Sequence, residues 1–383
     1  MQIAVNIEVA FSNPTGMGRY ARELLRQILQ LDRTHGYTLF HSRQYSWPPP
    51  GGGWQLPENF HVRPLPYSRK QLLLSWLLYG GPRALGNFIG VHGVYHDLAD
   101  ILLPVSSSRT IASLHDVFTL MFPDSFAWHS RVLFGKSRRQ LCRADAVITV
   151  SQYSKRKIVE LLGVVPEAVR VIYGGVSAAF VPTQDPGRLR ATRARYGLGD
   201  DYLLYVGVFN RRKNLGALLR AYRLYRSRGA TRVLLVCCGT PGIGSEDFYR
   251  DISELGLSGK VKIVQAASDG ELADLMSASR ALILPSLGEG FGLPVAEAMA
   301  CGAPVICGNR CAMAEIAGDA ALCVNPEDIE QIAAAIETVV GDEGLAQLMR
   351  ERGFEQAKRF SWAHTARQTL ALYHTLLSGA SLS

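Results

Sequence analysis

Residues 285–302 read PSLGEGFGLPVAEAMACG and are the most informative part of the chain. They follow the apolar run Ala281–Leu284, which predicts a buried strand. The run from Pro294 to Cys301 predicts a helix, because proline suits a first helical turn and Gly302 stands just past its end. A glycine-rich loop joins the two. This order predicts an α/β unit with an anion site, because backbone N–H groups and the helix dipole both favour negative charge at a helix N-terminus.

Two carboxylates flank this loop. Glu289 precedes the helix and Glu297 lies one turn inside it. Either feature alone would have an ordinary explanation, as a turn or as a favourable partner of the helix dipole. A ligand with both hydroxyls and phosphates would use the two together, because carboxylates accept from hydroxyls and amides serve phosphate oxygens. The predicted binding residues of the loop are Gly290, Phe291, Gly292 and Leu293.

The frame E-G-F-G-L-P-x-x-E resembles the E-x7-E signature of the retaining glycosyltransferases of family 4. The resemblance covers nearly the whole chain and is strongest over residues 203–325. It implies the GT-B architecture, in which two Rossmann-like, doubly wound parallel-sheet domains face a cleft. Residues 1–178 would form an acceptor domain, completed by a C-terminal crossover helix at 362–383. Residues 179–361 would form the domain that binds the nucleotide-sugar donor.

Length and composition agree with a two-domain α/β protein. The chain has 383 residues, of which 48% are hydrophobic and 19% charged, and this is too long for one comfortable core. The start at Met1 resembles a first strand rather than a signal peptide, and no apolar run approaches the ~20 residues of a membrane helix. Seven cysteines without a C-x-x-C pair are typical of a reducing compartment, so we expect a cytoplasmic location and no metal site.

The positive charge lies in the first half. Residues 1–180 carry 19 Lys and Arg against 11 Asp and Glu, whereas residues 181–383 carry 22 of each. A basic half suits nucleic acid, an anionic membrane surface or a pyrophosphate-bearing substrate. Nucleic acid is the weakest of these alternatives, because no recognised binding motif accompanies the charge.

A helix predicted for residues 69–79 has two interpretations. It is an ordinary core helix, or it meets a bilayer with its basic start among the headgroups and Trp76 near the interface. Further cations either extend such a face or are simply solvated sides of helices: Arg131, Lys136, Arg138, Arg139 and the run Lys155–Lys157.

The N-terminal half contributes a second glycine segment and two His-Asp pairs. A strand over Ile3–Ala10 runs into a loop with Gly16 and Gly18, which in the resemblance comes close to the donor diphosphate. Two strands end in His96-Asp97 and His115-Asp116, and we expect both pairs to open at the carboxyl edge of the sheet. The resemblance implies that His115 contacts the donor sugar. His96, Asp97 and Asp116 are assigned to the acceptor side.

The C-terminal half adds cations beyond a buried strand at residues 201–208. Arg212 can bind two phosphate oxygens in a fork, and Lys213 adds a point charge. The resemblance implies that Gly207 and the segment Arg212-Lys213-Asn214 bind the diphosphate. This chain has Asn210-Arg211 where many relatives carry Glu-Pro, so Arg211 either adds a third cation or points away. By family position, Gln265 borders the nucleotide base where relatives often carry glycine.

The expected function is therefore a metal-independent, retaining glycosyltransferase. Arg212, Lys213 and the loop amides would stabilise the departing diphosphate, Glu297 would hold ribose hydroxyls, and Glu289 with His115 would position the sugar. The segment from Gly318 to Pro326 resembles a mannosyltransferase branch, so GDP-mannose is the expected donor, ahead of UDP- or dTDP-sugars. The acceptor would be a glycan on a lipid pyrophosphate at the inner membrane face. A non-catalytic sugar-nucleotide binder is the alternative of another class.

Overall fold

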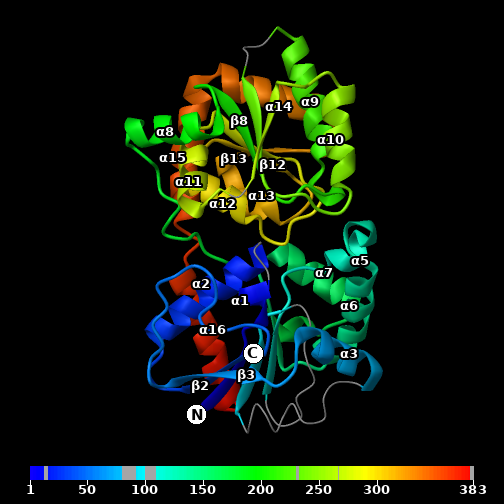
Figure 1. The fold of residues 1–383 in the computed structure, drawn as a ribbon, viewed down its shortest axis with the longest axis vertical. Coiled ribbons are helices and arrows are strands. Elements are labelled where there is room, and N and C mark those ends of the chain that lie inside the picture. The colour runs from blue at the N-terminus through cyan, green and yellow to red at the C-terminus, as the bar shows by residue number, and fades with distance from the viewer. Residues whose placement is uncertain (13–15, 80–91, 100–108, 230–232, 266, 380–383) are drawn as a thin grey trace. The chain divides into compact units, whose positions relative to one another are not determined.

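The chain divides into two compact units, each built on one parallel sheet (Figure 1). The computed structural model describes residues 1–12, 16–79, 92–99, 109–229, 233–265 and 267–379. Unit 1 comprises Met1–Pro123, Ala127–Gly175 and Ser361–Ser383, and unit 2 comprises Asp124–Phe126 and Val176–Phe360. The C-terminal helix thus belongs with the first unit in space, although it is last in sequence.

Unit 1 contains a seven-stranded sheet in the order β3-β2-β1-β4-β5-β6-β7, with every pairing parallel. The order reverses between β1 and β4, which places a topological switch point at their carboxyl ends. The strands are β1 Gln2–Asn6, β2 Gly36–Ser42, β3 Phe60–Leu65, β4 Val94–Asp97, β5 Arg109–Ser113, β6 Ala146–Thr149 and β7 Val169–Val171.

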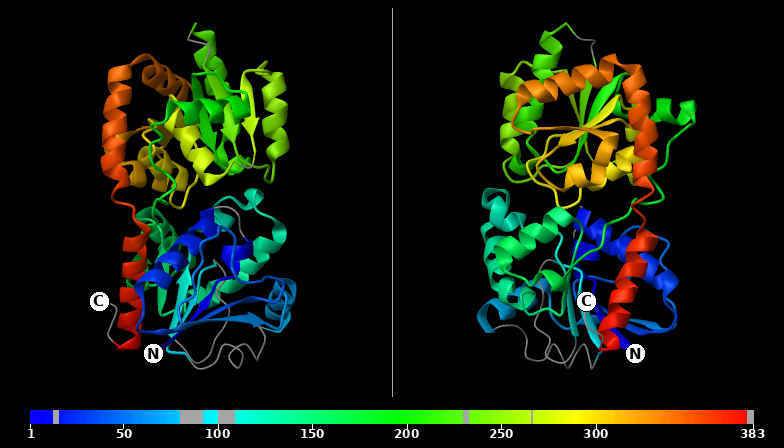
Figure 2. Two further views of the ribbon diagram at one scale, coloured as in Figure 1. Left: turned by 60° about the vertical axis from the view of Figure 1, so that its left-hand side comes forward. Right: turned by 180° about the vertical axis from the view of Figure 1, so that it is seen from behind.

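Helices cover both faces of this sheet (Figure 2). The C-terminal helix α16 packs against α2, and α3 packs against α6. The helices described in this unit are α1 Glu8–Ser12, α2 Gly16–Leu31, α3 Arg69–Tyr79, α5 Phe118–Met121, α6 Trp128–Leu141, α7 Gln152–Leu162 and α16 Trp362–Leu377.

The first strand is shorter than the sequence predicts. It ends at Asn6, whose side-chain oxygen accepts a hydrogen bond from the Glu8 amide at 3.0 Å and turns the chain into α1. The predicted glycine loop is also partly helical, because α2 begins at Gly16. The remainder of that loop, 13–15, lies outside the described residues. Asparagine favours such turns over a continued strand. Asn6 therefore signalled the end of the strand, but it stands within an apolar run that led to the longer prediction.

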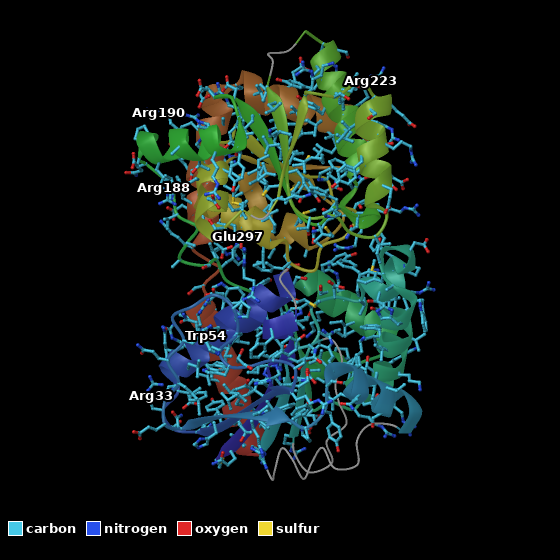
Figure 3. The ribbon with its side chains drawn as sticks, viewed as in Figure 1. Arg33, Trp54, Arg188, Arg190, Arg223 and Glu297 are labelled. Carbon is cyan, nitrogen blue, oxygen red and sulfur yellow. The ribbon has the colours of Figure 1, made fainter. Side chains whose placement is uncertain are left out.

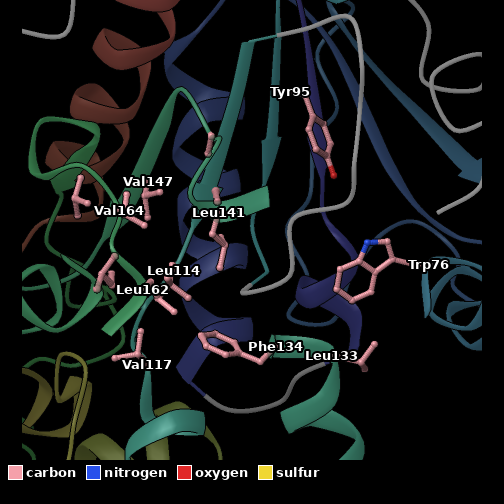
Figure 4. Close-up of a cluster of buried hydrophobic side chains, with 14 of the residues drawn as sticks. Trp76, Tyr95, Leu114, Val117, Leu133, Phe134, Leu141, Val147, Leu162 and Val164 are labelled. Atoms are coloured by element: carbon pink, nitrogen blue, oxygen red, sulfur yellow. The ribbon is translucent and has the colours of Figure 1, made fainter. Parts of the chain in front are cut away.

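The bilayer interpretation of α3 is wrong for its tryptophan. Trp76 is only 2% exposed and belongs to the core cluster formed with Leu133 and Phe134 of α6 (Figure 4). The ordinary interpretation as a core helix holds, because the large apolar side chains of α3 and α6 bury one another between the two helices and the sheet.

Unit 2 contains a six-stranded parallel sheet in the order β10-β9-β8-β11-β12-β13. Its strands are β8 Tyr202–Val206, β9 Leu234–Cys238, β10 Val261–Val264, β11 Ala281–Leu284, β12 Val305–Gly308 and β13 Ala321–Val324. Its α-helices are α8 Pro186–Tyr196, α9 Leu215–Ser227, α10 Ser245–Glu254, α11 Asp269–Ser277, α12 Leu293–Ala300, α13 Ala312–Ala317, α14 Ile329–Gly341 and α15 Glu343–Ala357.

The order of this second sheet reverses between β8 and β11. These strands pair in parallel with Ala281 opposite Leu203, so the loops that follow them leave the same edge of the sheet side by side. The predicted strand at Ala281–Leu284 is confirmed. The helix after its loop is confirmed one residue early, with Gly292 capping it at φ +96° and Gly302 beyond it at φ +77°. Ligands of doubly wound sheets gather at such a reversal.

Candidate active site

Two loops meet beyond the carboxyl ends of β8 and β11. The Leu287 amide donates to the Arg212 carbonyl at 2.9 Å, and the Arg212 guanidinium donates to the Gly288 carbonyl. A main-chain bond and a side-chain bond therefore hold together two segments whose contacting residues Arg212 and Gly288 lie 76 residues apart in sequence. The sequence predicted functional residues in both segments without showing that they touch.

Glu289 is the centre of this meeting point. Its carboxylate accepts from Lys213 Nζ, lies 3.4 Å from Arg212 Nη1 and accepts from Ser286 Oγ at 3.2 Å. Glu289 is 9% exposed and Lys213 8% exposed, so the ion pair is nearly removed from water. Two cations therefore share one carboxylate in this cluster. An anion with more than one negative charge is the natural ligand for such a cluster.

The cluster shifts the ionisation of its members. Burial would raise the pKa of Glu289, but the charges of Lys213 and Arg212, together with hydrogen bonds from Lys213 and Ser286, hold it below its ordinary value. Burial lowers the pKa of Lys213 and repulsion from Arg212 adds to this, while Glu289 opposes both. The carboxylate therefore stays ionised, and its attraction offsets part of the effect of burial on the pKa of Lys213.

Asn214 supports the cluster from one side. Its backbone is left-handed at φ +57°, and its amide donates to the Pro285 carbonyl at 3.0 Å and the Pro326 carbonyl at 2.6 Å. These bonds engage both amide hydrogens, so in this structure the side chain fixes the Arg212-Lys213 turn rather than offering a donor to a ligand. The donor-binding role of Asn214 stays a prediction.

Two further positions of this loop, Arg211 and Gly207, lie differently from the cluster residues. Arg211 is exposed and pairs with Asp247 of α10 at 3.2 Å, so it points away from the cluster. Gly207 has φ +152°, and an added Cβ would lie 3.1 Å from the Tyr205 hydroxyl. Glycine therefore lets the backbone turn tightly just before the cations.

The rest of the predicted loop lies on and around α12. Gly290, Phe291 and Gly292 are buried, and the Phe291 ring meets Phe360 edge to face at 5.4 Å. Leu293 begins the helix, and Glu297 lies one turn further at 1% exposed (Figure 3). An ionisable side chain so deeply buried next to a glycine loop is typical of a functional site. Gln265, at the end of β10, is exposed.

The His-Asp pairs of unit 1 behave differently from one another. The expectation that both open at the sheet edge is wrong for the first pair, because His96 and Asp97 are both fully buried. His96 Nδ1 meets the Tyr373 hydroxyl at 2.6 Å and Nε2 meets Ser113 Oγ at 2.9 Å. Both ring nitrogens are thus engaged in the core, and burial lowers the pKa of His96 to about 3.

Asp97 likewise serves the switch point of the first sheet. It accepts from Asn6 Nδ2 at 3.1 Å and from the Tyr95 hydroxyl at 2.7 Å. These bonds join the ends of β1 and β4. The acceptor role predicted for this pair therefore finds no geometric support.

The second pair lies in different surroundings. His115 is 7% exposed, with its ring edge to face on Tyr20 of α2 at 4.5 Å. Asp116 is half-buried and accepts from the Phe118 amide at 2.9 Å, which begins α5. Gly18 is buried and Gly16 exposed in the first turn of α2. The assignment of His115 to the donor sugar stays a prediction.

Sequence reasoning missed Ser286. This side chain is fully buried and donates to the carboxylate of Glu289. A serine two residues beyond a buried strand and three before a glutamate was the available signal. Only the tertiary contact distinguishes it from a solvent-facing loop serine.

Family models of known proteins match both halves of the chain. The family model described as Glycosyltransferase Family 4 matches residues 14–180, and the model described as Glycosyl transferases group 1 matches residues 191–356. The O-antigen chain mannosyltransferase B of Escherichia coli is 29% identical over 369 residues, which cover 94% of this chain and 96% of that protein.

Solved structures agree on the fold. Sucrose-phosphate synthase from Thermosynechococcus elongatus superimposes with a TM-score of 0.78 at 20% identity, covering 99% of this chain and 100% of that chain. The Anabaena protein Alr3699/HepE, in complex with UDP and glucose, gives a TM-score of 0.72 at 18% identity, covering 98% and 100%. Both similarities extend over two parallel-sheet units rather than one.

Proposed function

The chain belongs to the family 4 glycosyltransferases with the GT-B fold, and from this premise we propose that it transfers mannose from GDP-mannose to a lipid-linked glycan, with retention of the anomeric configuration. The observation that carries the proposal is the buried cluster of Arg212, Lys213 and Glu289 at the switch point of unit 2. The similarity to the O-antigen chain mannosyltransferase supports the sugar and the polysaccharide context.

The cluster supplies the chemistry that a diphosphate leaving group needs. As the bond from sugar to phosphate breaks, negative charge grows on the phosphate oxygens, and Arg212 and Lys213 stabilise it more in the transition state than in the resting donor. Each charge-assisted hydrogen bond contributes about 1.5 to 3 kcal/mol. With the cations engaged by phosphate, Glu289 is released to accept from a sugar hydroxyl.

The remaining roles follow from placement. Glu297, buried on α12, accepts from ribose hydroxyls. The acceptor hydroxyl attacks the anomeric carbon on the face from which the diphosphate departs. The diphosphate takes up the proton of that hydroxyl. A covalent sugar on Glu289 is the alternative mechanism. No step in this scheme requires a metal ion, because two side-chain cations neutralise the leaving group.

A second class of nucleotide sugar is the alternative to GDP-mannose as the donor. UDP- or dTDP-sugars would use the same cations, since these cations contact only the diphosphate, and the fold neighbour Alr3699/HepE was solved with UDP and glucose. The exposed Gln265 near the expected base position favours neither base. A non-catalytic sugar-nucleotide binder is less well supported, because the carboxylate and both cations are present and in contact.

A nucleotide-sugar panel tests the donor. A donor at ~100 times its dissociation constant should stabilise the protein by about 2.7 kcal/mol, so the melting temperature should rise with GDP-mannose and not with UDP- or dTDP-sugars. Transfer to a lipid-linked acceptor should then give an α-linked product by NMR, because the configuration of the donor is kept. A β-linked product, or binding without turnover, would contradict the mechanism.

Two adjacent arginines offer a matched test of the site. Arg212→Ala should lower kcat/KM by about 10- to 100-fold, the loss expected for one charge-assisted bond. Arg211→Ala, which removes only an exposed pair with Asp247, should stay within about twofold of the wild type. Equal effects of the two substitutions would place the diphosphate elsewhere.

The membrane partner is proposed on α6 rather than α3. The stretch Trp128–Leu141 carries four cations and no acidic residue, and Trp128 is 73% and Val132 45% exposed. Such a basic helix with an exposed tryptophan at one end suits the cytoplasmic face of an anionic bilayer. Within the described residues, no helix is both long and apolar enough to span a membrane.

Vesicle co-sedimentation tests this surface. Binding should require anionic lipid and should fall with Arg131→Glu or Arg139→Glu. The matched charge reversal Arg223→Glu on α9 of unit 2 should leave binding unchanged. Equal binding to zwitterionic vesicles would show that the cations of α6 do not bind the protein to anionic lipid.

A further inference from the structure

Two cysteines face each other across the last strand pair of unit 2. Cys307 of β12 and Cys323 of β13 are direct partners in the parallel register, and their Sγ atoms lie 3.9 Å apart. All seven cysteines of the chain are free thiols. Partners in register project their side chains to the same face of a sheet, so these two sulfurs stay neighbours without any change of pairing.

The two thiols differ in access. Cys307 is fully buried, whereas Cys323 is exposed on the terminal strand of the sheet. Contact with Cys323, together with burial, raises the pKa of the Cys307 thiol well above its ordinary value, and the same contact lowers the pKa of Cys323. The reachable sulfur is thus also the one more readily ionised, which is the arrangement of an attacking thiol with a second thiol behind it.

We propose that Cys307 and Cys323 form an oxidation site that takes up low-molecular-weight disulfides and closes to an internal disulfide. The Cys323 thiolate attacks one sulfur of the small disulfide and expels the other as a thiolate. Cys307 then attacks Cys323 Sγ and expels the second small thiolate. One protein S–S bond replaces one small-molecule S–S bond, and the two protein thiol protons end on the two expelled thiols, so the small disulfide is reduced.

Formation of this disulfide should move the loops of the candidate active site. The sulfurs must move from 3.9 Å to about 2.05 Å, which draws β13 toward β12. Two residues after β13, the Pro326 carbonyl holds the amide of Asn214 at 2.6 Å. This is the residue that fixes the Arg212-Lys213 turn.

The other strand leads to the same cluster. Gly308, the residue after Cys307, is packed so closely that an added Cβ would lie 2.8 Å from the Ser286 carbonyl. Ser286 in turn donates to Glu289. Oxidation should therefore displace the supports of both the cations and the carboxylate, and should weaken binding of a nucleoside diphosphate. This consequence rests on the proposed function, whereas the oxidation site does not.

Mass spectrometry tests the site independently of any ligand. The full-length protein should lose two hydrogen masses on treatment with oxidised glutathione. After alkylation of the remaining thiols and digestion, it should yield a linked peptide containing Cys307 and Cys323. Cys307→Ala should stop at a mixed disulfide of glutathione on Cys323, because the second thiol is missing. Cys142→Ser, which removes the other exposed cysteine, should leave the linked peptide unchanged.

Two results would overturn the oxidation site. One is the absence of the linked peptide in the wild-type protein. The other is alkylation of Cys323 at the same rate before and after treatment. Both measurements use the wild-type chain alone, so they decide the question even if Cys307→Ala does not fold.

Nucleotide binding tests whether oxidation of the two cysteines weakens the candidate active site. The dissociation constant for GDP, and for UDP in parallel, should rise about tenfold on oxidation, the equivalent of about one net hydrogen bond. Dithiothreitol should restore it, and Cys323→Ser should be insensitive. If the reduced protein binds neither nucleotide, the proposed function fails while the oxidation site stands. If oxidised and reduced protein bind equally, the link between the disulfide and the loops is refuted.

Discussion

At the scale of single residues, Glu289 engages the two cations that the proposed function assigns to a diphosphate. Its carboxylate accepts a hydrogen bond from Lys213 and lies 3.4 Å from Arg212 Nη1. In the proposed function, a diphosphate would have to displace this carboxylate to use the same cations. The exchange costs less than desolvating bare cations, because the buried charges are never left without a partner.

Replacing this carboxylate separates binding from turnover. Glu289→Gln should bind free nucleoside diphosphate more tightly, by about tenfold, because a competing negative charge is gone. It should also lose most transfer activity, because the sugar loses its carboxylate partner. Calorimetry and a transfer assay measure the two effects. Weaker diphosphate binding in this variant would show that Glu289 does not compete with the ligand.

His96 makes a pH-dependent contribution to stability. The folded protein keeps it neutral down to a pKa of about 3, because it is fully buried and lies near His115, whereas an unfolded histidine takes up a proton near pH 6.5. The unfolded state therefore binds more protons between these limits, and the free energy of unfolding should fall by up to about 1.4 kcal/mol per pH unit as the pH drops below 6.5. Denaturant unfolding at pH 7 and pH 5 measures this slope, which should be smaller in His96→Asn; identical slopes in the two proteins would contradict the assignment.

The sequence predicted part of the site at this scale and not the rest. Glu289, Arg212 and Lys213 were recognisable because charged side chains beside glycine loops at strand ends are chemically unusual. The support given by Ser286 and Asn214 was not, because each acts through a contact with a distant segment. The expectation that His96 opens at the sheet edge was wrong, since a histidine at a strand end has the same sequence pattern whether it faces solvent or the core.

At the scale of elements, the turn between β8 and α9 depends on one asparagine. Asn214 combines a left-handed backbone with bonds to carbonyls of two other loops. Glycine tolerates the same φ but makes neither bond.

Asn214→Gly should therefore leave the fold intact and lower kcat/KM by about 10- to 100-fold, the loss expected for two hydrogen bonds of about 1 kcal/mol each. Steady-state kinetics together with circular dichroism measure the two properties. Asn214→Ala should be worse, because alanine also strains the backbone. Wild-type kinetics in Asn214→Gly would mean that the turn holds its shape without the side chain.

Element type was easier to predict than element role. Buried strands and the α12 segment followed from apolar runs and glycine or proline punctuation. The face that a helix presents did not follow for α3, because leucines occur all around it and Trp76 had no sequence signal for burial. Its partner surface on α6 became apparent only from the tertiary packing.

At the scale of the whole molecule, the chain returns to unit 1 beside the point where it leaves it. Gly175 ends the second segment of unit 1, and Ser361 begins the third. An added Cβ at Gly175 would lie 2.2 Å from the Trp362 amide nitrogen. Thr365 of α16 donates to the Tyr173 carbonyl at 2.7 Å, which fixes the returning helix at the same place.

Gly175→Ala should therefore destabilise the protein by about 1 to 3 kcal/mol, because backbone atoms cannot yield as a flexible side chain does. Gly135→Ala is the matched control. It lies in α6 with no heavy atom within 4 Å of an added Cβ, and alanine there should be neutral or stabilising by about 0.5 to 1 kcal/mol. Denaturant midpoints of the two variants give the comparison. A neutral Gly175→Ala would mean that the returning helix can shift freely.

The pairing of β8 with β11 has a consequence for recombination between relatives. Arg212 and Glu289 lie on opposite sides of a segment, 215–284, that makes up more than a third of unit 2, yet they share one ion-paired cluster. A chimaera with a single crossover anywhere inside that segment would join cations from one parent to a carboxylate from the other, and their loops would have to match by chance. Exchanging the segment as a cassette, with both borders kept, leaves this partnership within one parent.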